Sequence, residues 1–267
     1  MILDISSQLQ SLRRQLLRWP QMVSASSKGL VFVGLTVSLS VGALGCSRNA
    51  ATEANRAGES AAELSPAEAE AAERAEWDAQ MARVKSVLDG MDRAELIGDS
   101  ATKGPLDADV ILLKFSDFEC PFCAVAAADM KSFTKIHESD VLYVYKQFPL
   151  VTIHEEAMPA AKAAWAAGQQ DQFWIYHDGL FAFQDKLGED YYVDLAKQIG
   201  LDIEKFERDR NSPEAQAAID KDLALAEALG LSGTPTFLMN ELLIPGGAPL
   251  EFFEEAVIRL KEVPAGE

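Results

Sequence analysis

Residues 110–123 read VILLKFSDFECPFC, and this stretch decides the fold that we expect. The apolar run 110–115 is typical of a buried strand, and the residues that follow Cys123 are typical of a helix. The Cys-x-x-Cys pair is therefore expected on the first turn of a helix that leaves the end of a strand. Residues three apart lie on the same face of a helix, so the two sulfur atoms can meet.

The first cysteine, Cys120, is expected where unpaired backbone N–H groups and the helix dipole stabilise an anion. Such a position lowers a thiol pKa from about 8.5 and provides a thiolate at neutral pH. A structural disulfide is one alternative, but a loop this small would constrain the unfolded chain little. Half of a zinc site is another, but zinc needs a second ligand pair, and His137, His154 and His177 are too widely spaced to provide one. We expect dithiol redox chemistry, with no metal and no cofactor.

The composition excludes some classes of partner. The chain has 267 residues, of which 48% are hydrophobic, so it is long enough and apolar enough for a substantial core. Its formal net charge is −18. Nucleic acid and anionic lipid surfaces attract basic proteins, so we expect neither to be bound by charge.

The N-terminal region has the layout of an export signal. Residues 29–45 form an uncharged run of 17 residues that follows several basic residues and ends in small ones. The next residue is Cys46, and Ala43-Leu44-Gly45-Cys46 resembles a bacterial lipobox, although that motif prefers Leu where this chain has Ala43. Lipidation of Cys46, simple cleavage and a retained signal anchor are the three alternatives. Each makes 1–46 an export signal and places the rest of the chain in the periplasm or facing the cell envelope.

Two further segments precede the globular part. Residues 47–64 are rich in Ala, Glu and Ser, as in a flexible tether. Ser65, Pro66 and Glu68 form a capping box that starts a helix, so 65–100 is expected to be an N-terminal helix and connector. One apolar stripe runs along it, formed by Trp77, Met81, Val84 and Leu88. This stripe either docks the helix on the domain or forms a dimer contact.

The remainder, 101–267, is predicted to be one α/β domain. Further strands are expected at 141–146, 236–239 and 242–244, and a last helix follows them. Between the second and third strands, about 155–229 reads as an insertion of four helices. The element order predicts a mixed central sheet interrupted by this helical insertion.

Three motifs together give the chain a family resemblance: FSDFECPFC at 115–123, KQFPL at 146–150 followed by His154 and an Ala-rich helix, and GLSGTPTFLMN at 230–240. With them, the chain resembles the DsbA-like branch of the thioredoxin superfamily. The resemblance implies a thioredoxin fold and disulfide exchange with protein clients and a redox partner protein. It also implies that Pro235 is cis beside the cysteines and that Thr234 contacts the sulfur of the nucleophile.

The resemblance also implies roles for residues around the pair. Pro121 and Phe122, between the cysteines, would tune reactivity and contact the client. Many relatives carry an acidic proton-handling residue six positions before the first cysteine, whereas this chain has Lys114. Lys114, Asp117 and Glu119 are the candidates for proton handling. Lys114 either helps to hold a thiolate or points to solvent, and we favour solvent. The two acidic residues are expected to face outward or lie at the turn.

In the expected mechanism, Cys120 forms a mixed disulfide with the client and the less exposed Cys123 resolves it. Net oxidation is favoured over reduction or isomerisation, although Pro121-Phe122 lacks the histidine of the strongest oxidants of the family. A non-catalytic peptide-binding module is the alternative from another class, and it would not need both cysteines. For His154, near a helix start, and His177, among aromatic residues, we expect structural roles.

The anchor can be tested by mass spectrometry of the mature protein from membranes. We expect the chain to begin at Cys46 with lipid attached, because the apolar run and the small residues before it are typical of lipoprotein processing. Several acyl chains hold a protein firmly on a membrane, whereas one alone binds reversibly. An unmodified Cys46, or a start beyond it, would contradict the anchor and leave the redox prediction intact.

Overall fold

The computed structural model describes residues 65–262. From Trp77 onward these residues belong to one compact unit, and 65–76 belong to another. The predicted export signal, lipobox and tether lie outside the described residues. Within 65–262, no helix is both long and apolar enough to cross a membrane.

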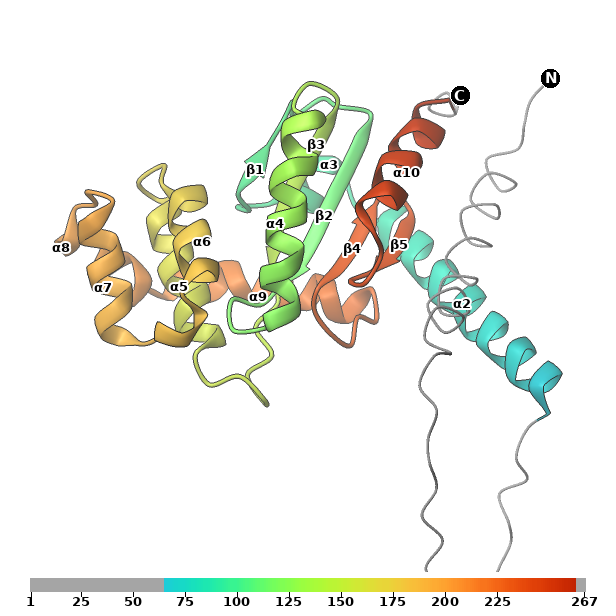
Figure 1. Ribbon diagram of the computed structural model, residues 1–267, viewed down its shortest axis with the longest axis horizontal. Helices are drawn as coiled ribbons and strands as arrows, with labels where there is room; N and C mark the ends of the chain where they lie inside the picture. Colours follow the sequence, from blue (N-terminus) through green and yellow to red (C-terminus); the bar gives the residue numbers. More distant parts are fainter. Residues whose placement is uncertain (1–64, 263–267) are drawn as a thin grey trace, which may run out of the picture. The chain divides into compact units, whose positions relative to one another are not determined.

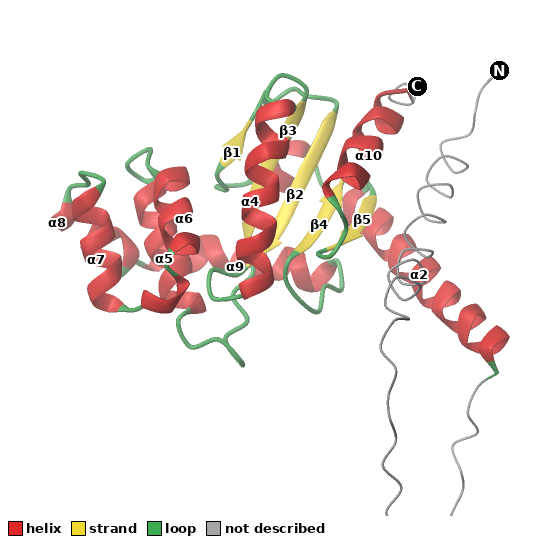
Figure 2. Cartoon of the chain, in the orientation of Figure 1, coloured by secondary structure: helices red, strands yellow, loops and turns green. Residues whose placement is uncertain are grey.

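A five-stranded mixed sheet forms the centre of the domain, in the order β1-β3-β2-β4-β5 (Figures 1 and 2). The strands are β1 (Thr102–Lys103), β2 (Val110–Ser116), β3 (Val141–Gln147), β4 (Thr236–Met239) and β5 (Leu242–Pro245). β2 pairs in parallel with β3, and the other neighbours are antiparallel. The predicted mixed sheet is confirmed, and the short edge strand β1 is an addition to it.

Both central strands are buried along their whole length. Alternate side chains of a strand point to opposite faces of a sheet. One face of β2 carries Ile111, Leu113 and Phe115, which pack with Leu225 and other apolar residues. The opposite face carries Lys114, whose register partner on β3 is Tyr145. Because both faces are covered, even a charged residue of β2 is removed from solvent.

The helices cover both faces of the sheet. They are α2 (Pro66–Leu88), α3 (Arg93–Ile97), α4 (Pro121–Ile136), α5 (Ala157–Gly168), α6 (Phe173–Ala182), α7 (Glu189–Gln198), α8 (Ile203–Arg210), α9 (Pro213–Ala228) and α10 (Leu250–Glu262), with a short 3₁₀ helix, η1, at Gln184–Lys186. α4 and α10 lie on one face, and α9 crosses behind the other (Figure 1).

The helical insertion was predicted with four helices, and the structure shows five, α5 to α9, so this prediction was wrong by one. The missed helix, α8, has the sequence IEKFERDR, which lacks an apolar stripe. Asp202 caps its N-terminus by accepting a hydrogen bond from the Lys205 N–H, and Phe206 is its one fully buried apolar side chain. Tertiary packing of that ring, rather than periodicity, makes the segment helical.

The predicted capping box and the docking stripe of α2 are both found. The Ser65 N–H donates to Glu68, and the Glu68 N–H donates back to the Ser65 hydroxyl. Within the unit that starts at Trp77, Val84 is fully buried in the core beneath the sheet, and the Gln80 amide donates to the Leu229 carbonyl. The stripe therefore docks on the domain, while dimerisation through this helix stays untested.

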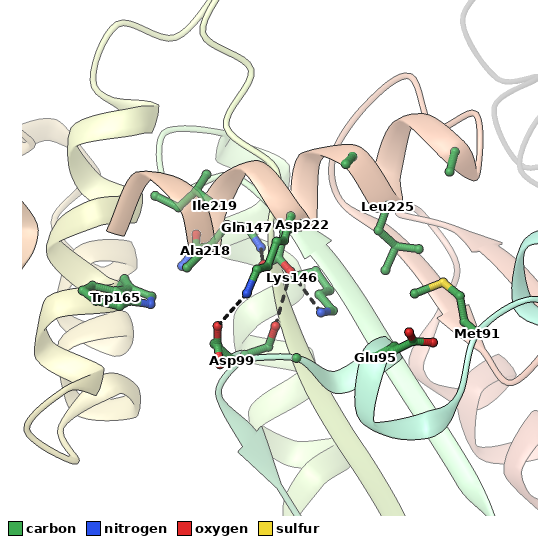
Figure 3. A pocket seen from close by; sticks show the side chains of 15 residues that line it. Met91, Glu95, Asp99, Lys146, Gln147, Trp165, Ala218, Ile219, Asp222 and Leu225 are labelled. Carbon is green, nitrogen blue, oxygen red and sulfur yellow. Dashed lines mark hydrogen bonds and ion pairs between the residues drawn. The ribbon is translucent and has the colours of Figure 1, made fainter. Parts of the chain in front are cut away.

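A buried ion pair links β3 to α9. Lys146 Nζ lies 3.0 Å from Asp222 Oδ1 and also donates to the Ile97 carbonyl, while the Gln147 N–H donates to Asp222 Oδ2. Burial raises the pKa of the Asp222 carboxyl, and the Lys146 charge opposes this. The pair lines a cavity of about 500 Å³ between α3, α5 and α9 (Figure 3).

This pair yields a stability prediction. Lys146→Met should lower the free energy of unfolding by about 3–5 kcal/mol, because it leaves a buried carboxylate without its partner. Lys221→Met is the matched control: Lys221 pairs with Asp99 at the exposed surface, so its loss should cost at most about 1 kcal/mol. Urea unfolding monitored by tryptophan fluorescence measures both, and equal effects would contradict the assignment.

Candidate active site

The two cysteines lie just after the turn that connects β2 to α4. β2 ends at Ser116, the chain turns, and Cys120 is the N-cap residue of α4, with Pro121 at its first helical position. Proline fits there because its missing N–H would be unpaired anyway. The first bond of the helix runs from the Cys123 N–H to the Cys120 carbonyl. Cys120 is 4% exposed and Cys123 is 0% exposed, the order predicted from the sequence.

The two thiols are made unequal by their surroundings. A hydrogen bond from the Cys123 thiol lowers the pKa of Cys120 most; burial opposes it, and Thr234 and the backbone N–H groups of Cys123 and Phe122 lower it further, to about 5. Burial raises the pKa of Cys123 far above its ordinary value, and the bond to Cys120 adds to this. Cys120 is thus the thiolate at neutral pH, and Cys123 keeps its proton.

The loop before β4 lies directly against the nucleophile. The Thr234–Pro235 peptide bond is cis, as predicted. The Cys120 thiol lies 3.4 Å from the Thr234 carbonyl oxygen, so the predicted contact with Thr234 is confirmed. The Thr234 hydroxyl is buried and has no hydrogen-bond partner within residues 65–262. Segments more than a hundred residues apart in sequence thereby form one site.

Lys114 does not point to solvent, so that prediction was wrong. Its side chain is 0% exposed because this face of β2 is covered by α4 and α6. Nζ lies 3.3 Å from the Cys123 carbonyl oxygen and within 6 Å of the ring centres of Tyr145 and Phe181. Burial lowers the pKa of Lys114 to about 8, while the charges of Cys123, Cys120 and Asp129 act in the other direction.

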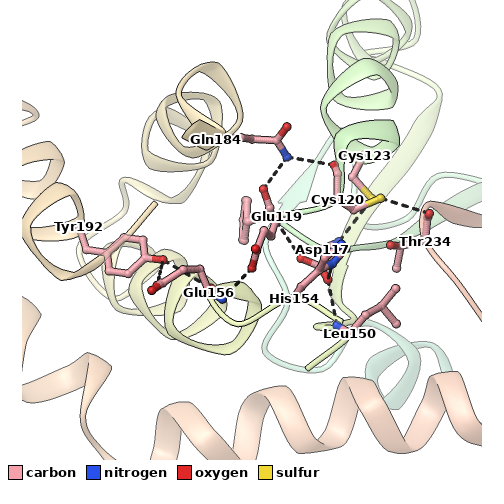
Figure 4. A network of polar contacts seen from close by, with 11 residues as sticks. Asp117, Glu119, Cys120, Cys123, Leu150, His154, Glu156, Gln184, Tyr192 and Thr234 are labelled. Atoms are coloured by element: carbon pink, nitrogen blue, oxygen red, sulfur yellow. Dashed lines mark hydrogen bonds and ion pairs between the residues drawn. The ribbon is translucent and has the colours of Figure 1, made fainter. Parts of the chain in front are cut away.

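Asp117 does not face outward either. Its carboxylate is fully buried and accepts three hydrogen bonds: from the Glu119 N–H at 2.8 Å, the Leu150 N–H at 2.9 Å and His154 Nδ1 at 2.7 Å (Figure 4). The Asp117 N–H lies 3.5 Å from the sulfur of Cys123. Asp117 therefore shapes the turn between β2 and α4 and fixes the loop after β3 to it.

Glu119 lies at the turn, as predicted, and its carboxylate is hydrogen-bonded within the protein. Its carboxylate accepts from the Glu156 N–H at 2.7 Å, and the Glu156 side chain accepts from the Tyr192 hydroxyl at 2.7 Å. The Gln184 amide donates to the Cys120 carbonyl at 3.0 Å. These bonds attach the active-site turn to α5, α7 and η1 (Figure 4), so the helical insertion supports the cysteines.

The sequence did not indicate that His154 lies near the two cysteines. We expected only a structural role near a helix start, and the residue lies in the loop before α5, bonded to Asp117. Burial alone would lower its pKa, but the hydrogen bond and charge of Asp117, with Glu119 and Cys120, raise it. The protonated form of His154 is therefore favoured beside Asp117, and it loses its charge as the pH rises through this raised pKa.

His177, in contrast, lies among the aromatic residues of the core, as predicted. Its ring contacts those of Phe118, Tyr145 and Phe173, and burial lowers its pKa to about 4. Its Nδ1 pairs with Asp178. It belongs to the packing beneath the active-site turn.

Exposed apolar side chains flank the cysteines. Phe122 is 72% exposed on the first turn of α4, and Val125 is exposed one turn later. Val151 and Ile153 are exposed in the loop that also carries His154. Large apolar groups left in water beside a reactive group are typical of a binding surface.

With this geometry in view, the comparisons with known proteins assign the family. A family model described as thioredoxin matches residues 97–257, which is more than half of the chain. The chain belongs to the thioredoxin family. A thioredoxin-like oxidoreductase from Silicibacter pomeroyi is 32% identical, with a TM-score of 0.59, and the match covers 64% of this chain and 99% of that one.

Two more distant structures show the same fold. They are the thiol-disulfide exchange protein alpha-DsbA2 from Wolbachia pipientis, 21% identical with a TM-score of 0.61 over 70% of this chain and 98% of that one, and a linker-deletion variant of ScsC from Proteus mirabilis, 22% identical with a TM-score of 0.60 over 77% and 99%. The predictions of an oxidoreductase of the thioredoxin superfamily and of its fold with a helical insertion are confirmed.

The curated relatives are antiporters, and they match this chain over only part of their own length. A Na⁺/H⁺ antiporter NhaA from Salinispora tropica is 33% identical over 156 residues, which are 58% of this chain and 24% of the antiporter. One from Herminiimonas arsenicoxydans is 35% identical over 138 residues, or 52% and 22%. The chain thus spans about a quarter of the length of these relatives.

The unequal thiols yield a prediction for alkylation. In the reduced protein, the rate at which iodoacetamide modifies Cys120 should rise with pH around a midpoint near 5 and be level by neutral pH, because the lowered pKa makes the thiolate dominant above that value. Cys123 should resist modification. In Cys123→Ala the midpoint should rise, since the strongest stabilising hydrogen bond is gone. Mass spectrometry of quenched samples measures this, and a wild-type midpoint near the ordinary thiol value of about 8.5 would contradict it.

Proposed function

We propose that this protein exchanges disulfides with protein clients outside the cytoplasm through Cys120 and Cys123, with net oxidation of the client. The observation that carries the proposal is the paired geometry of the thiols. Cys120, whose thiolate is stabilised, is the N-cap residue of α4, and the fully buried Cys123 lies one turn further along the helix. This is the arrangement that disulfide exchange needs, because one sulfur must meet the client and the other must resolve the mixed disulfide.

The direction of electron flow depends on whether the protein stabilises its reduced form or its disulfide form. The low pKa of Cys120 means that its thiolate is stabilised in the reduced protein. Stabilising the reduced form makes the disulfide a stronger oxidant. Lys114 supplies positive charge that the Pro121-Phe122 pair lacks, and the raised pKa of His154 favours its protonated form. Net oxidation is therefore favoured, with reduction or isomerisation at the same site as the alternative.

The surface around Cys120 suits a polypeptide client. Phe122, between the cysteines in sequence, and Ile153, in the loop that carries His154, are both strongly exposed. The backbone around the cis bond at Pro235 lies beside the nucleophile and could pair with an extended chain, a recognition mode that tolerates many sequences. Pro121, at the first helical position, would leave the helix N-terminus open to the client's sulfur.

Location outside the cytoplasm is supported by the sequence of 1–46, which has the layout of an export signal and ends in a run that resembles a lipobox at Cys46. A redox pair that oxidises clients needs a compartment in which disulfides persist. We propose a tethered protein, with membrane attachment through a lipid on Cys46 or a retained signal segment. The partner that reoxidises it would be a second redox protein.

The alternative from another class is a peptide-binding module without turnover. One experiment separates the two. In Cys123→Ser, Cys120 should still attack client disulfides, but the mixed disulfide should persist, so covalent complexes accumulate on gels run without reductant. Cys120→Ser is the matched control and should trap nothing. If both variants behave alike, the binding module is favoured and the redox function is contradicted.

A further inference from the structure

The backbone of Asp117 contacts both cysteines. Its N–H lies 3.5 Å from the sulfur of Cys123, and its carbonyl oxygen accepts the Cys120 N–H at 3.3 Å. Asp117 comes directly after β2, whose residues are all buried, so the turn starts from a fixed point. The placement of Cys123 relative to Cys120 therefore depends on how the two peptide groups that flank Asp117 are oriented.

The Asp117 carboxylate fixes that orientation. Oδ1 accepts the Glu119 N–H at 2.8 Å, which closes the turn before Cys120. Oδ2 accepts the Leu150 N–H at 2.9 Å and is bonded to His154 Nδ1 at 2.7 Å, so the same side chain is tied to the loop after β3. A side chain with three partners has little freedom to rotate, and its rotation would move the peptide groups on either side.

His154 differs from the other two partners of this carboxylate. They are backbone N–H groups without a charge, whereas a protonated imidazole supplies the counter-charge. The Asp117 side chain is 0% exposed, and a carboxylate removed from water is stable only where hydrogen bonds and an opposite charge compensate it. Within residues 65–262, His154 is the one basic side chain that pairs with Asp117.

The loop holds His154 in place for this contact. The N–H groups of Ile153 and His154 both donate to the Leu150 carbonyl at 3.0 Å, so 150–154 is a compact turn. The two ends of that turn, the Leu150 N–H and the His154 ring, meet the same oxygen of Asp117 (Figure 4). The position of the imidazole is therefore set by the backbone and not only by its own rotamer.

We propose that His154 is a positioning residue for disulfide exchange, which keeps Cys123 aligned with Cys120 by orienting Asp117. The inference rests on the proposed function. His154 is bonded to Asp117 and not to either sulfur, so its effect on the cysteines is indirect.

The step that needs this alignment is resolution of the mixed disulfide. The Cys123 sulfur attacks the Cys120 sulfur, and the Cys120–Cys123 bond forms. The client's sulfur leaves as a thiolate with the electron pair of the broken bond, and the thiol proton of Cys123 passes to the solvent. Such a displacement is fast only when the attacking sulfur is held in line. Burial raises the pKa of Cys123, and the Asp117 N–H acts in the opposite direction, so a misplaced Asp117 would also make the attacking thiolate rarer.

The reaction of the reduced protein with a dithiobis-nitrobenzoate separates the two steps. Cys120 attacks the reagent and releases one coloured thiolate, and Cys123 then attacks Cys120 and releases the second. Stopped-flow absorbance measures both phases. In His154→Leu the second phase should slow by about tenfold, the effect of one lost charge-assisted hydrogen bond. The first phase should stay nearly unchanged, because attack on the reagent does not involve Cys123.

Two amide variants separate position from mere presence of a polar group. In His154→Asn the amide nitrogen lies about where Nδ1 lies and can donate to Asp117, so the second phase should recover to within about threefold of the unaltered rate. In His154→Gln the amide nitrogen lies about where Nε2 lies, so this variant should be as slow as His154→Leu. The contrast between the two amides stays measurable even if the leucine variant does not fold, which circular dichroism checks.

A double-mutant cycle tests the route through Asp117. In an Asp117→Asn background, adding His154→Leu should slow the second phase little further, because the two residues act as one unit. His137→Leu is the matched control. His137 Nδ1 lies 3.2 Å from Asp140 in a similarly buried pair, but at the other end of α4, so both phases should stay unchanged.

An unchanged second phase in folded His154→Leu and His154→Gln would overturn the inference and leave the redox function in place. Equal slowing in His154→Asn and His154→Gln, independent slowing in the Asp117→Asn background, or slowing in His137→Leu would overturn it as well. Release of only one coloured thiolate by the unaltered protein would instead contradict the proposed function, and the inference with it.

Discussion

Burial of β2 on both faces is the constraint from which the active site follows. All seven of its residues are inside, including Lys114 and Ser116. Because the strand is central, its end is fixed relative to β3 and β4, and the turn into α4 begins from a rigid point. A reactive thiol at a helix N-terminus is useful only if the helix does not move relative to the loop opposite it. β4 pairs with β2, so Thr234 is held against Cys120 by the same sheet.

The turn itself is held by a carboxylate inside the protein. Asp117 satisfies backbone N–H groups on both sides of the site and also fixes His154. A buried carboxylate persists only where it is fully hydrogen-bonded, and this one is. The helical insertion contributes through Glu119 and Gln184, which attach the turn to helices far along the chain. The insertion is thus part of the active site's support.

Two basic side chains lie near the cysteines in a protein of strongly acidic composition. The chain carries a formal charge of −18, yet Lys114 reaches the Cys123 carbonyl and His154 is bonded to Asp117 in the turn before the pair. Each stabilises a negative sulfur by a different route: one as a buried amine behind Cys123, the other as an imidazole held by Asp117. Both lie on elements outside the Cys-x-x-Cys motif.

The sequence by itself determined strands β2 to β5, the helix that carries Cys120 and Cys123, the capping box at Ser65 and the family, because these depend on periodicity and on short motifs whose spacing fixes their geometry. It also predicted that Cys120 lies at the helix start and is more exposed than Cys123, as the structure shows. It missed α8, whose residues have no apolar period and are helical only because Phe206 packs.

Tertiary structure alone decided the surroundings of the pair. Alternation along a strand places Lys114 and Phe115 on opposite faces of the sheet, but it does not show that both faces are covered. Lys114 was therefore expected in solvent, whereas it lies in the core. His154 is 37 residues from Asp117 in sequence, and no local pattern predicts that contact. Burial and long-range pairing are properties of the assembled layers. They lower the pKa of Lys114 through burial and raise that of His154 through Asp117, effects that the local sequence does not show.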